Sequence, residues 1–337
     1  MVNQIGHVVG IIFMIAASIF FTSCDNAPPQ ADKPIQKISI AVMPHSFTGY
    51  TIFVSQEKGF FKEQGLAVTL QTKFPHGKGI LQAMIEKKTE LAVSSETPFM
   101  HAVLSGAEIA TITATVKARK HLGIVCRKDK GISSAGDLRG KKIGVTIGSN
   151  GEFFLDTVLL LNGIQRNAVE VIHLKPNQMI DSILKGDVDA VATWNPQLSM
   201  ARKELGEQGR TFYADNLYSP FFIVSARQDY VLSYPDTITK VVRALHNTTE
   251  FIHKNQDESQ KIISKYLKID PLLLKELSAT YSFKTNLEQS FLITLENQSK
   301  WAIKKNRIPQ TDIPNFLNYI YTDALEEVVP EAMTIIR

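Results

Sequence analysis

The sequence has 337 residues, of which 44% are hydrophobic and 21% charged, with a formal net charge of +4. This length exceeds the size at which one hydrophobic core usually stops growing, so two compact parts are expected. The Lys and Arg residues are scattered, and the largest basic group, Lys117-Ala-Arg-Lys120, is short. This pattern indicates an ordinary solvated surface and argues against a nucleic-acid partner.

The amino terminus carries an apolar segment, residues 8–21, that is followed by Cys24. The segment is shorter than the roughly twenty residues that a transmembrane helix needs, and it is typical of a signal peptide. Small residues before the cysteine resemble the bacterial lipoprotein box, in which the cysteine is lipidated. Phe21 and the absence of Lys and Arg from residues 2–23 depart from that box, so a plain secretory signal or a single anchor helix stays open.

We therefore predict a signal peptide over residues 1–23 and a lipid-anchored linker over residues 24–36, with the lipid on Cys24. Asp25 resembles the signal that retains Gram-negative lipoproteins in the inner membrane. The linker is polar and Pro-rich, which favours an extended tether. The other cysteine, Cys126, lies in an apolar run, so we expect a buried structural thiol and no disulfide within the domain.

Strands and helices alternate from residue 38 onward, which predicts βαβ units and a mainly parallel sheet. The first half contains expected strands at 38–42, 66–72, 91–93 and 109–115 and expected helices at 54–61, 80–88 and 99–104. The pattern restarts at Lys120, with expected strands at 122–127, 142–147, 169–173 and 190–192 and a helix at 153–161.

A strand at 221–225 is expected to return to the first lobe, so that crossings near residues 115–120 and 218–224 would form a hinge. Everything after Pro235 reads as helical, with expected helices at 238–253, 259–267, 272–279, 287–304 and 313–325. These helices would brace the first lobe.

One pattern occurs twice, over residues 80–98 and 180–196. Each copy has a helix, an acidic residue (Glu90 or Asp189), a short apolar strand, a polar turn and a proline. Such a turn lies at the carboxyl end of a strand, where parallel α/β sheets bind ligands. The repeat predicts an internal duplication with two lobes that face one cleft.

Two residues near these strand ends have alternative interpretations. Ser149, with Glu152 three positions later, forms a capping box ahead of a helix; a helix N-terminus suits an anion, but Glu152 already occupies part of that field. Trp194 ends a strand, where its ring can pack on a ligand, although a lone tryptophan also suits a core.

No catalytic motif is present: the sequence has no G-x-S-x-G elbow, P-loop, H-E-x-x-H or G-x-G-x-x-G after a strand. The histidines show no metal-ligand spacing. We therefore expect binding without turnover, with no metal and no cofactor.

Four stretches, in this order, carry a family resemblance: residues 57–66, 76–106, 137–145, and 183–191 with Trp194 and Pro196. They resemble the substrate-binding proteins of bacterial ABC transporters for nitrate, sulfonates and taurine, a class that includes binders of thiamine-precursor pyrimidines. The resemblance spans residues 37–330. It implies an α/β, two-lobed type II periplasmic-binding fold with a hinge and a ligand cleft between the lobes. Lobe I would comprise residues 37–117 and 224–337, and lobe II residues 118–223.

The resemblance also implies a site and partners. The protein would be a monomer on the extracytoplasmic or periplasmic face of the membrane, held by the lipid on Cys24, that passes a small organic or anionic ligand to a permease and its ATPase. An enzyme of pyrimidine biosynthesis on the same fold, or a sensory lipoprotein, is the alternative. The residues expected to contact the ligand lie in the turns that follow strands: His45, Ser46, Phe47, Ser94, Ser95, Thr97, Ser149, Asn150, Trp194 and Asn195.

Overall fold

The computed structural model describes residues 35–336, except residues 75, 214–216, 307 and 309. The predicted signal peptide, the lipidation at Cys24 and residues 24–34 of the linker lie outside the described residues. Ile35–Arg337 form one compact unit. In the described part of the chain, no helix is long and apolar enough to cross a membrane.

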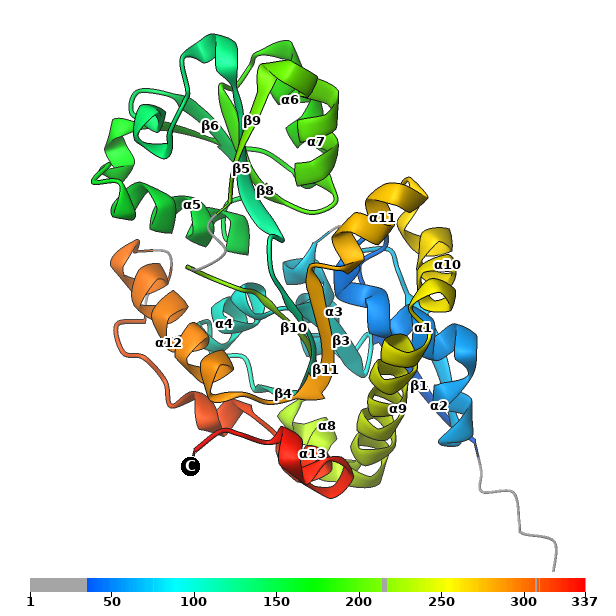
Figure 1. Ribbon diagram of the computed structural model, residues 1–337. Helices are drawn as coiled ribbons and strands as arrows, with labels where there is room; N and C mark the ends of the chain where they lie inside the picture. Colours follow the sequence, from blue (N-terminus) through cyan, green and yellow to red (C-terminus); the bar gives the residue numbers. More distant parts are fainter. Residues whose placement is uncertain (1–34, 75, 214–216, 307, 309, 337) are drawn as a thin grey trace, which may run out of the picture. The chain divides into compact units, whose positions relative to one another are not determined.

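The compact unit contains two mixed β-sheets (Figure 1). Sheet A has the strand order β11-β4-β10-β3-β1-β2, and sheet B the order β7-β6-β8-β5-β9. Sheet A is formed by β1 (Gln36–Ala41), β2 (Leu66–Gln71), β3 (Leu91–Ser95), β4 (Ile109–Ala118), β10 (Phe221–Arg227) and β11 (Tyr281–Asn286). Sheet B is formed by β5 (Leu122–Arg127), β6 (Lys142–Val145), β7 (Glu170–His173), β8 (Ala190–Trp194) and β9 (Gly209–Tyr213).

The predicted duplication is visible in the topology. In sheet A, β1 pairs in parallel with β2 and β3, and in sheet B, β6 pairs in parallel with β7 and β8. β3 then pairs antiparallel with β10, and β8 pairs antiparallel with β5. β5 follows β4 of sheet A in the sequence but lies in sheet B, and β10 follows β9 of sheet B but lies in sheet A. Each sheet therefore contains one strand that the chain enters directly from the other sheet.

The expectation of mainly parallel sheets is wrong in part. β10 runs antiparallel to both of its neighbours, and so does β5. Strands linked by crossover helices keep one direction, whereas these two strands enter from the other sheet without a covering helix. Parallel pairing, as predicted, is found within β1, β2 and β3 and within β6, β7 and β8.

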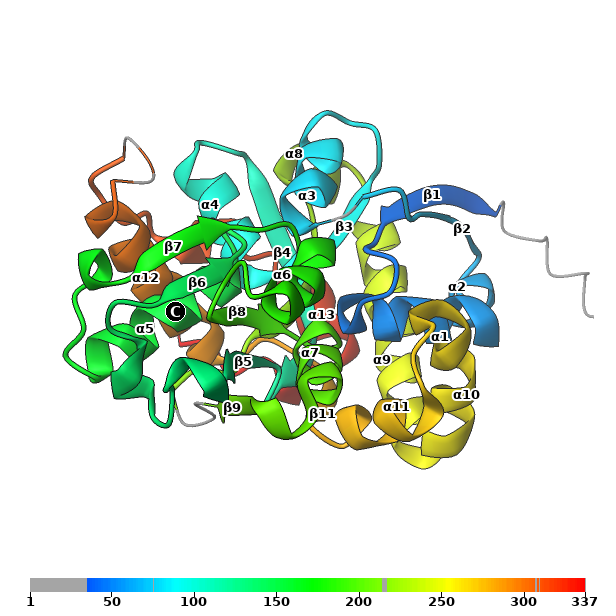
Figure 2. The ribbon, with the colours of Figure 1, turned by 90° about the horizontal axis from the view of Figure 1, so that it is seen from above.

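Helices cover both faces of the sheets. In Figures 1 and 2, α5 lies on one face of sheet B, and α6 and α7 lie on the other; beside sheet A, α1, α2 and α9 lie on one side, and α4 and α12 on the other. The helices are α1 (Tyr50–Lys58), α2 (Phe60–Glu63), α3 (Gly77–Ile85), α4 (Glu96–Leu104), α5 (Asn150–Leu161), α6 (Met179–Lys185), α7 (Gln197–Leu205), α8 (Gln228–Ser233), α9 (Pro235–Lys254), α10 (Gln256–Leu267), α11 (Pro271–Ser278), α12 (Gln289–Lys304) and α13 (Asp323–Val328).

The carboxyl-terminal part is not wholly helical, which corrects the sequence prediction. β11 pairs antiparallel with β4, and its buried residues Tyr281 and Phe283 alternate with exposed residues, as expected of a strand that covers one core face. The expected helix over 313–325 is replaced by a short 3-10 turn, Phe316–Tyr319, followed by α13.

Strand alternation divides the interior of sheet B between its two faces. Ala190, Ala192 and Trp194 of β8 pack in the cluster beside α5, whereas Val191 packs in the cluster beside α6 and α7. Cys126 lies in the first cluster as a fully buried free thiol, as predicted. Burial raises the pKa of this thiol, which keeps it protonated.

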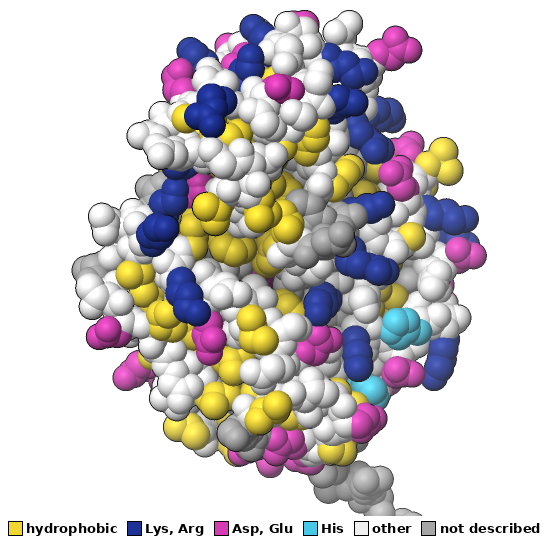
Figure 3. All heavy atoms as spheres, turned by 60° about the vertical axis from the view of Figure 1, so that its left-hand side comes forward, with side chains coloured by type: hydrophobic (Ala, Val, Ile, Leu, Met, Phe, Trp, Pro, Cys, Tyr) yellow, Lys and Arg dark blue, Asp and Glu magenta, His cyan; other side chains and the backbone are white. Residues whose placement is uncertain are grey.

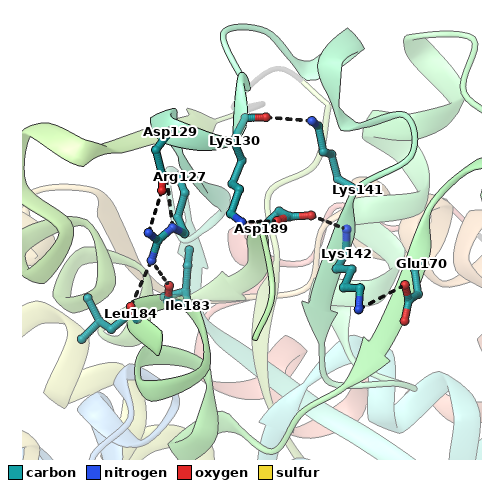
Figure 4. A network of polar contacts seen from close by, with 9 residues as sticks. All are labelled: Arg127, Asp129, Lys130, Lys141, Lys142, Glu170, Ile183, Leu184 and Asp189. Carbon is teal, nitrogen blue, oxygen red and sulfur yellow. Dashed lines mark hydrogen bonds and ion pairs between the residues drawn. The ribbon is translucent and has the colours of Figure 1, made fainter. Parts of the chain in front are cut away.

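The acidic residue that precedes the strand in each repeat has an equivalent role in both sheets. Glu90 accepts hydrogen bonds from the backbone N–H (2.6 Å) and hydroxyl (2.7 Å) of Ser39 in β1. Asp189 accepts from the backbone N–H of Lys142 at the start of β6 (2.9 Å) and lies 3.7 Å from the ammonium of Lys130 (Figure 4). Both carboxylates therefore tie the repeat strand to the neighbouring parallel strand.

Candidate functional site

A cavity of about 1230 Å³ lies between the two sheets. Many of its lining residues lie at the carboxyl ends of the parallel strands β1, β2, β3, β6, β7 and β8, and others come from α3, α4 and β10. Open α/β sheets bind ligands at this edge, because the loops there carry free polar groups. The volume is sufficient for a small organic molecule.

Seven of the ten predicted contacts line this cavity. Sheet A contributes His45, Ser46, Ser94 and Ser95, and sheet B contributes Ser149, Asn150 and Trp194. Trp194 combines its two interpretations, because it packs in the core beside α5 and also lines the cavity, with 8% of its surface exposed.

Three predicted contacts, Phe47, Thr97 and Asn195, are not among the lining residues. Phe47 is fully buried and stacks on Tyr281, with 4.5 Å between ring centroids. Thr97 is fully buried in the first turn of α4. The amide of Asn195 donates to the carbonyl of Lys120 (3.0 Å) and accepts from the hydroxyl of Ser199 (2.8 Å), so it fixes the crossing between the sheets.

The polar side chains of the cavity differ in how far the protein already satisfies them. Ser149 caps α5, because its hydroxyl accepts from the N–H of Gly151 (3.1 Å) and donates to the carbonyl of Thr146 (2.6 Å). Ser95 makes no capping hydrogen bond to α4, and among the described residues no partner is seen for the side chain of Asn150. Ser95 and Asn150 therefore offer donors to a ligand.

Glu152 limits the anion-binding capacity of the α5 N-terminus. Its carboxylate accepts from the N–H of Gly148 (2.8 Å) and pairs with Arg166 (3.2 Å). The Glu152 carboxylate thus already neutralises part of the positive end of the α5 dipole, as the sequence indicated. Ser149 has a structural role whether or not it contacts a ligand.

His121 lies in the crossing between β4 and β5 and lines the cavity with only 2% of its surface exposed. Its Nδ1 lies 2.7 Å from the Tyr281 hydroxyl. Burial lowers the pKa of His121 to about 3, so the ring is neutral at physiological pH. It can offer a ligand a hydrogen bond but no charge.

The charges that border the cavity are of one sign. Lys78 and Lys175 are lining residues, and no Asp or Glu is found among the described residues that line it. Such a cavity favours anionic or neutral ligands over cations.

The geometry agrees with the comparisons with known proteins. The NMT1/THI5-like family matches residues 46–259, which is more than half of the sequence. The chain belongs to this family. The resemblance drawn from the sequence is confirmed.

Relatives within and around the family are mainly binding proteins. A putative aliphatic sulfonates-binding protein of Bacillus subtilis is 24% identical over 80% of this chain and 81% of its own length. The crystal structure of the periplasmic aliphatic sulphonate binding protein SsuA from Escherichia coli superposes with a TM-score of 0.74 at 16% identity, covering 85% of this chain and 97% of that one. The predicted periplasmic-binding fold is confirmed.

An enzyme has the same fold. The structure of the desulfurization enzyme DSZB has a TM-score of 0.66 at 13% identity and covers 88% of this chain and 99% of that one. At such identity the likeness shows the fold alone, so chemistry must be argued from the residues of the cavity.

Sequence reasoning did not assign several histidines to the site. His76, His101, His121 and His173 line the same cavity as His45, although they come from separate segments. Among the described residues, no group of three or more His, Cys, Asp or Glu is arranged to hold a metal ion. The position of His76 after a strand and of His173 at the end of one is the one available signal, and it is weaker than the repeat.

The face that carries α5 and α12 shows where the two sheets meet on one side. Figure 3 views this face, and hydrophobic side chains gather across its middle, with Lys and Arg side chains around them. Phe153 of α5 packs edge-to-face against Trp301 of α12, with 5.4 Å between ring centroids. Trp301 in turn lies 5.9 Å from the ring of His101, a lining residue. An aromatic contact between the sheets therefore borders the cavity.

Proposed function

We propose that this protein is the solute-binding component of an ABC importer, which captures a small organic or anionic ligand between its two sheets and delivers it to a membrane permease. The observation that carries the proposal is the cavity: both sheets line it from their strand ends with hydroxyl, amide and imidazole groups, and the described residues of its lining include no carboxylate. Family membership and the names of the relatives, which include sulfonate and taurine binders, support it.

Binding would couple to closure. Residues 37–117 with 224–337 would move as one lobe and residues 118–223 as the other, about the two crossings. A ligand that contacts Ser94 and Ser95 on one side and Asn150 and Trp194 on the other favours the closed arrangement, because only there can it make both sets of contacts.

The enzymatic alternative has less support from the cavity. Cys126 is the one cysteine of the described residues, and it is fully buried outside the lining. His121 is held neutral, and its Nδ1 partner is the Tyr281 hydroxyl, whose pKa burial raises well above 10, so this hydroxyl is not activated as a nucleophile. Binding without turnover fits these groups better.

A ligand screen tests the proposal. Purified protein is heated with sulfonates, taurine, nitrate and pyrimidines, and we expect at least one compound to raise the melting temperature, since a ligand at a hundred times its Kd adds about 2.7 kcal/mol. For such a compound, Trp194→Ala should weaken binding about tenfold, whereas Trp194→Phe, which keeps an aromatic face, should weaken it less. Absence of any stabilising compound would contradict the binding function. Equal affinity of Trp194→Ala and the parent would contradict the site.

Cys24 is proposed as the lipid anchor that holds the domain on the extracytoplasmic face of the membrane, because it follows an apolar segment and precedes a Pro-rich linker. Metabolic labelling with palmitate should label the parent and not Cys24→Ala. Equal labelling of both would exclude this anchor.

A further inference from the structure

Two equivalent loops of the two sheets each carry a His-x-Lys sequence. His76-Gly-Lys78 follows β2, and His173-Leu-Lys175 begins at the last residue of β7. β2 and β7 hold the same place in the repeat, because each pairs in parallel with the first strand of its half. All four basic side chains are exposed and line the cavity, and together they are called the rim cluster here.

Backbone hydrogen bonds orient the two histidines of the rim cluster. His76 Nδ1 accepts from the N–H of Gly79 (3.1 Å), and His173 Nδ1 accepts from the N–H of Ile147 (3.2 Å). A ring nitrogen that accepts carries no proton, so Nε2 is the nitrogen that can donate from each ring. Each ring therefore has one N–H donor and no free acceptor for a ligand.

The two lysines of the rim cluster are uncompensated. Lys88 pairs with Glu86 at 2.5 Å and Lys130 lies near Asp189, but no carboxylate among the described residues forms an ion pair with Lys78 or Lys175. Since the lining residues that the structure describes include no Asp or Glu, the rim cluster has four donors and two lysine charges in one cavity. Groups of this kind recognise an anion such as a carboxylate, sulfonate or phosphate.

We propose that the rim cluster is an anion subsite that holds the charged end of the ligand between the two sheets. The rest of the ligand then lies against Ser95, Asn150 and Trp194, which offer neutral donors and an aromatic face. This assignment rests on the proposed binding function and adds two things to it: the ligand class, an organic anion with a neutral body, and the ligand's direction, charge towards His76 and His173.

Because each sheet contributes one His and one Lys, an anion held by both pairs favours the closed arrangement. The pairs are exposed, so salt screens their attraction, and each lysine contributes modestly. The four side chains thus govern charge preference more than total affinity.

The test uses matched four-carbon probes: butyrate, 1-butanesulfonate and butyl phosphate, each beside its uncharged amide or ester counterpart. Affinities are measured by calorimetry for the parent, Lys78→Gln, Lys175→Gln and the double variant. Lys62→Gln on α2 and Lys203→Gln on α7 are the controls, because both lysines are exposed and outside the lining.

We expect the parent to prefer an anion over its uncharged counterpart, with a loss of about threefold for each rim lysine and about tenfold for both at low ionic strength. The loss should shrink in high salt, and the control variants should match the parent. Equal affinity of the double variant and the controls for an anionic probe would overturn the subsite. Binding of uncharged probes alone would also overturn it and leave the proposed function standing. If no probe and no compound of the wider screen binds, the proposed function itself fails.

Discussion

Glu96 is a fully buried carboxyl group next to the cavity, at the start of α4. It accepts hydrogen bonds from the hydroxyl of Tyr218, from the amide of Gln298 (3.0 Å) and from the N–H of Phe221 (3.0 Å). No cation is among these partners, and burial raises the pKa of Glu96 to about 8. At neutral pH this carboxyl is therefore mostly protonated in the folded protein.

The raised pKa predicts that stability falls as the solution becomes alkaline. The unfolded carboxyl ionises near pH 4.5, so the stability due to the folded carboxyl is fully present below that pH and is lost as the pH rises through 8. Between pH 6.5 and 8 we expect a loss of about 2 kcal/mol from this group. Glu96→Gln removes the ionisation. Its amide NH2 cannot accept as the second carboxyl oxygen does, so the variant is less stable at every pH, but its stability should change less over this range.

Unfolding in urea at pH 6.5 and pH 8 measures the difference between the parent and Glu96→Gln. This range avoids the opposite effect of His121, whose pKa of about 3 in the folded state lowers stability only as the pH falls below about 6.5. Parallel pH dependence in the two proteins would show that Glu96 is ionised in the fold at neutral pH.

For single residues, the sequence predicted which polar turns border the cavity better than it predicted which side chains of those turns line it. Ser94 and Ser95 end β3 and Trp194 ends β8, so their place at the cavity could be predicted from chain order. Phe47 follows β1 and Asn195 follows β8, but their side chains point to partners from distant segments, Tyr281 and Lys120. A pattern of strands and turns contains no information about such partners.

Elements joined by short, regular connections were predicted well, and elements fixed by distant pairing were not. The repeat helices α3 and α6 and the strands β3 and β8 were found from local periodicity. β11 was missed, because Tyr281–Asn286 lies between two helices and becomes a strand only by pairing with β4. The antiparallel direction of β5 and β10 likewise follows from the exchange of strands between sheets, which local sequence does not encode.

A polar contact beside α12 holds the two sheets together, in addition to the two chain crossings between β4 and β5 and between β9 and β10. Asp156 of α5 accepts a hydrogen bond from Trp301 Nε1 (2.8 Å) and pairs with Lys305 (3.0 Å), which follows α12. Within its own half it pairs with Arg166 (2.7 Å). The Asp156 side chain is only 7% exposed, so these contacts are less screened than a surface ion pair.

Trp301 lies in α12 beside sheet A, Lys305 directly follows α12, and Asp156 lies in α5 beside sheet B. This contact therefore exists only while the sheets stay close on that side. We expect Asp156→Asn to weaken it by about 1–3 kcal/mol and to populate more open arrangements. Small-angle scattering should then give a larger radius of gyration. In a Trp194→Phe background, the emission of Trp301, the remaining tryptophan, should shift towards that of a solvated ring.

Glu327→Gln is the matched control, because Glu327 pairs with Arg243 (3.0 Å) between α13 and α9, which both belong to the half built on sheet A. This variant also removes a carboxylate that forms an ion pair, but it leaves the contact between the sheets intact. The Glu327 side chain is 60% exposed, so we expect little change in the radius of gyration or in the Trp301 emission. An unchanged radius of gyration and unchanged Trp301 emission in Asp156→Asn would mean that the crossings and the aromatic packing of Phe153 on Trp301 hold the sheets together without it. A change in both, absent from the control, would identify α12 and α5 as a second connection that governs opening of the cavity.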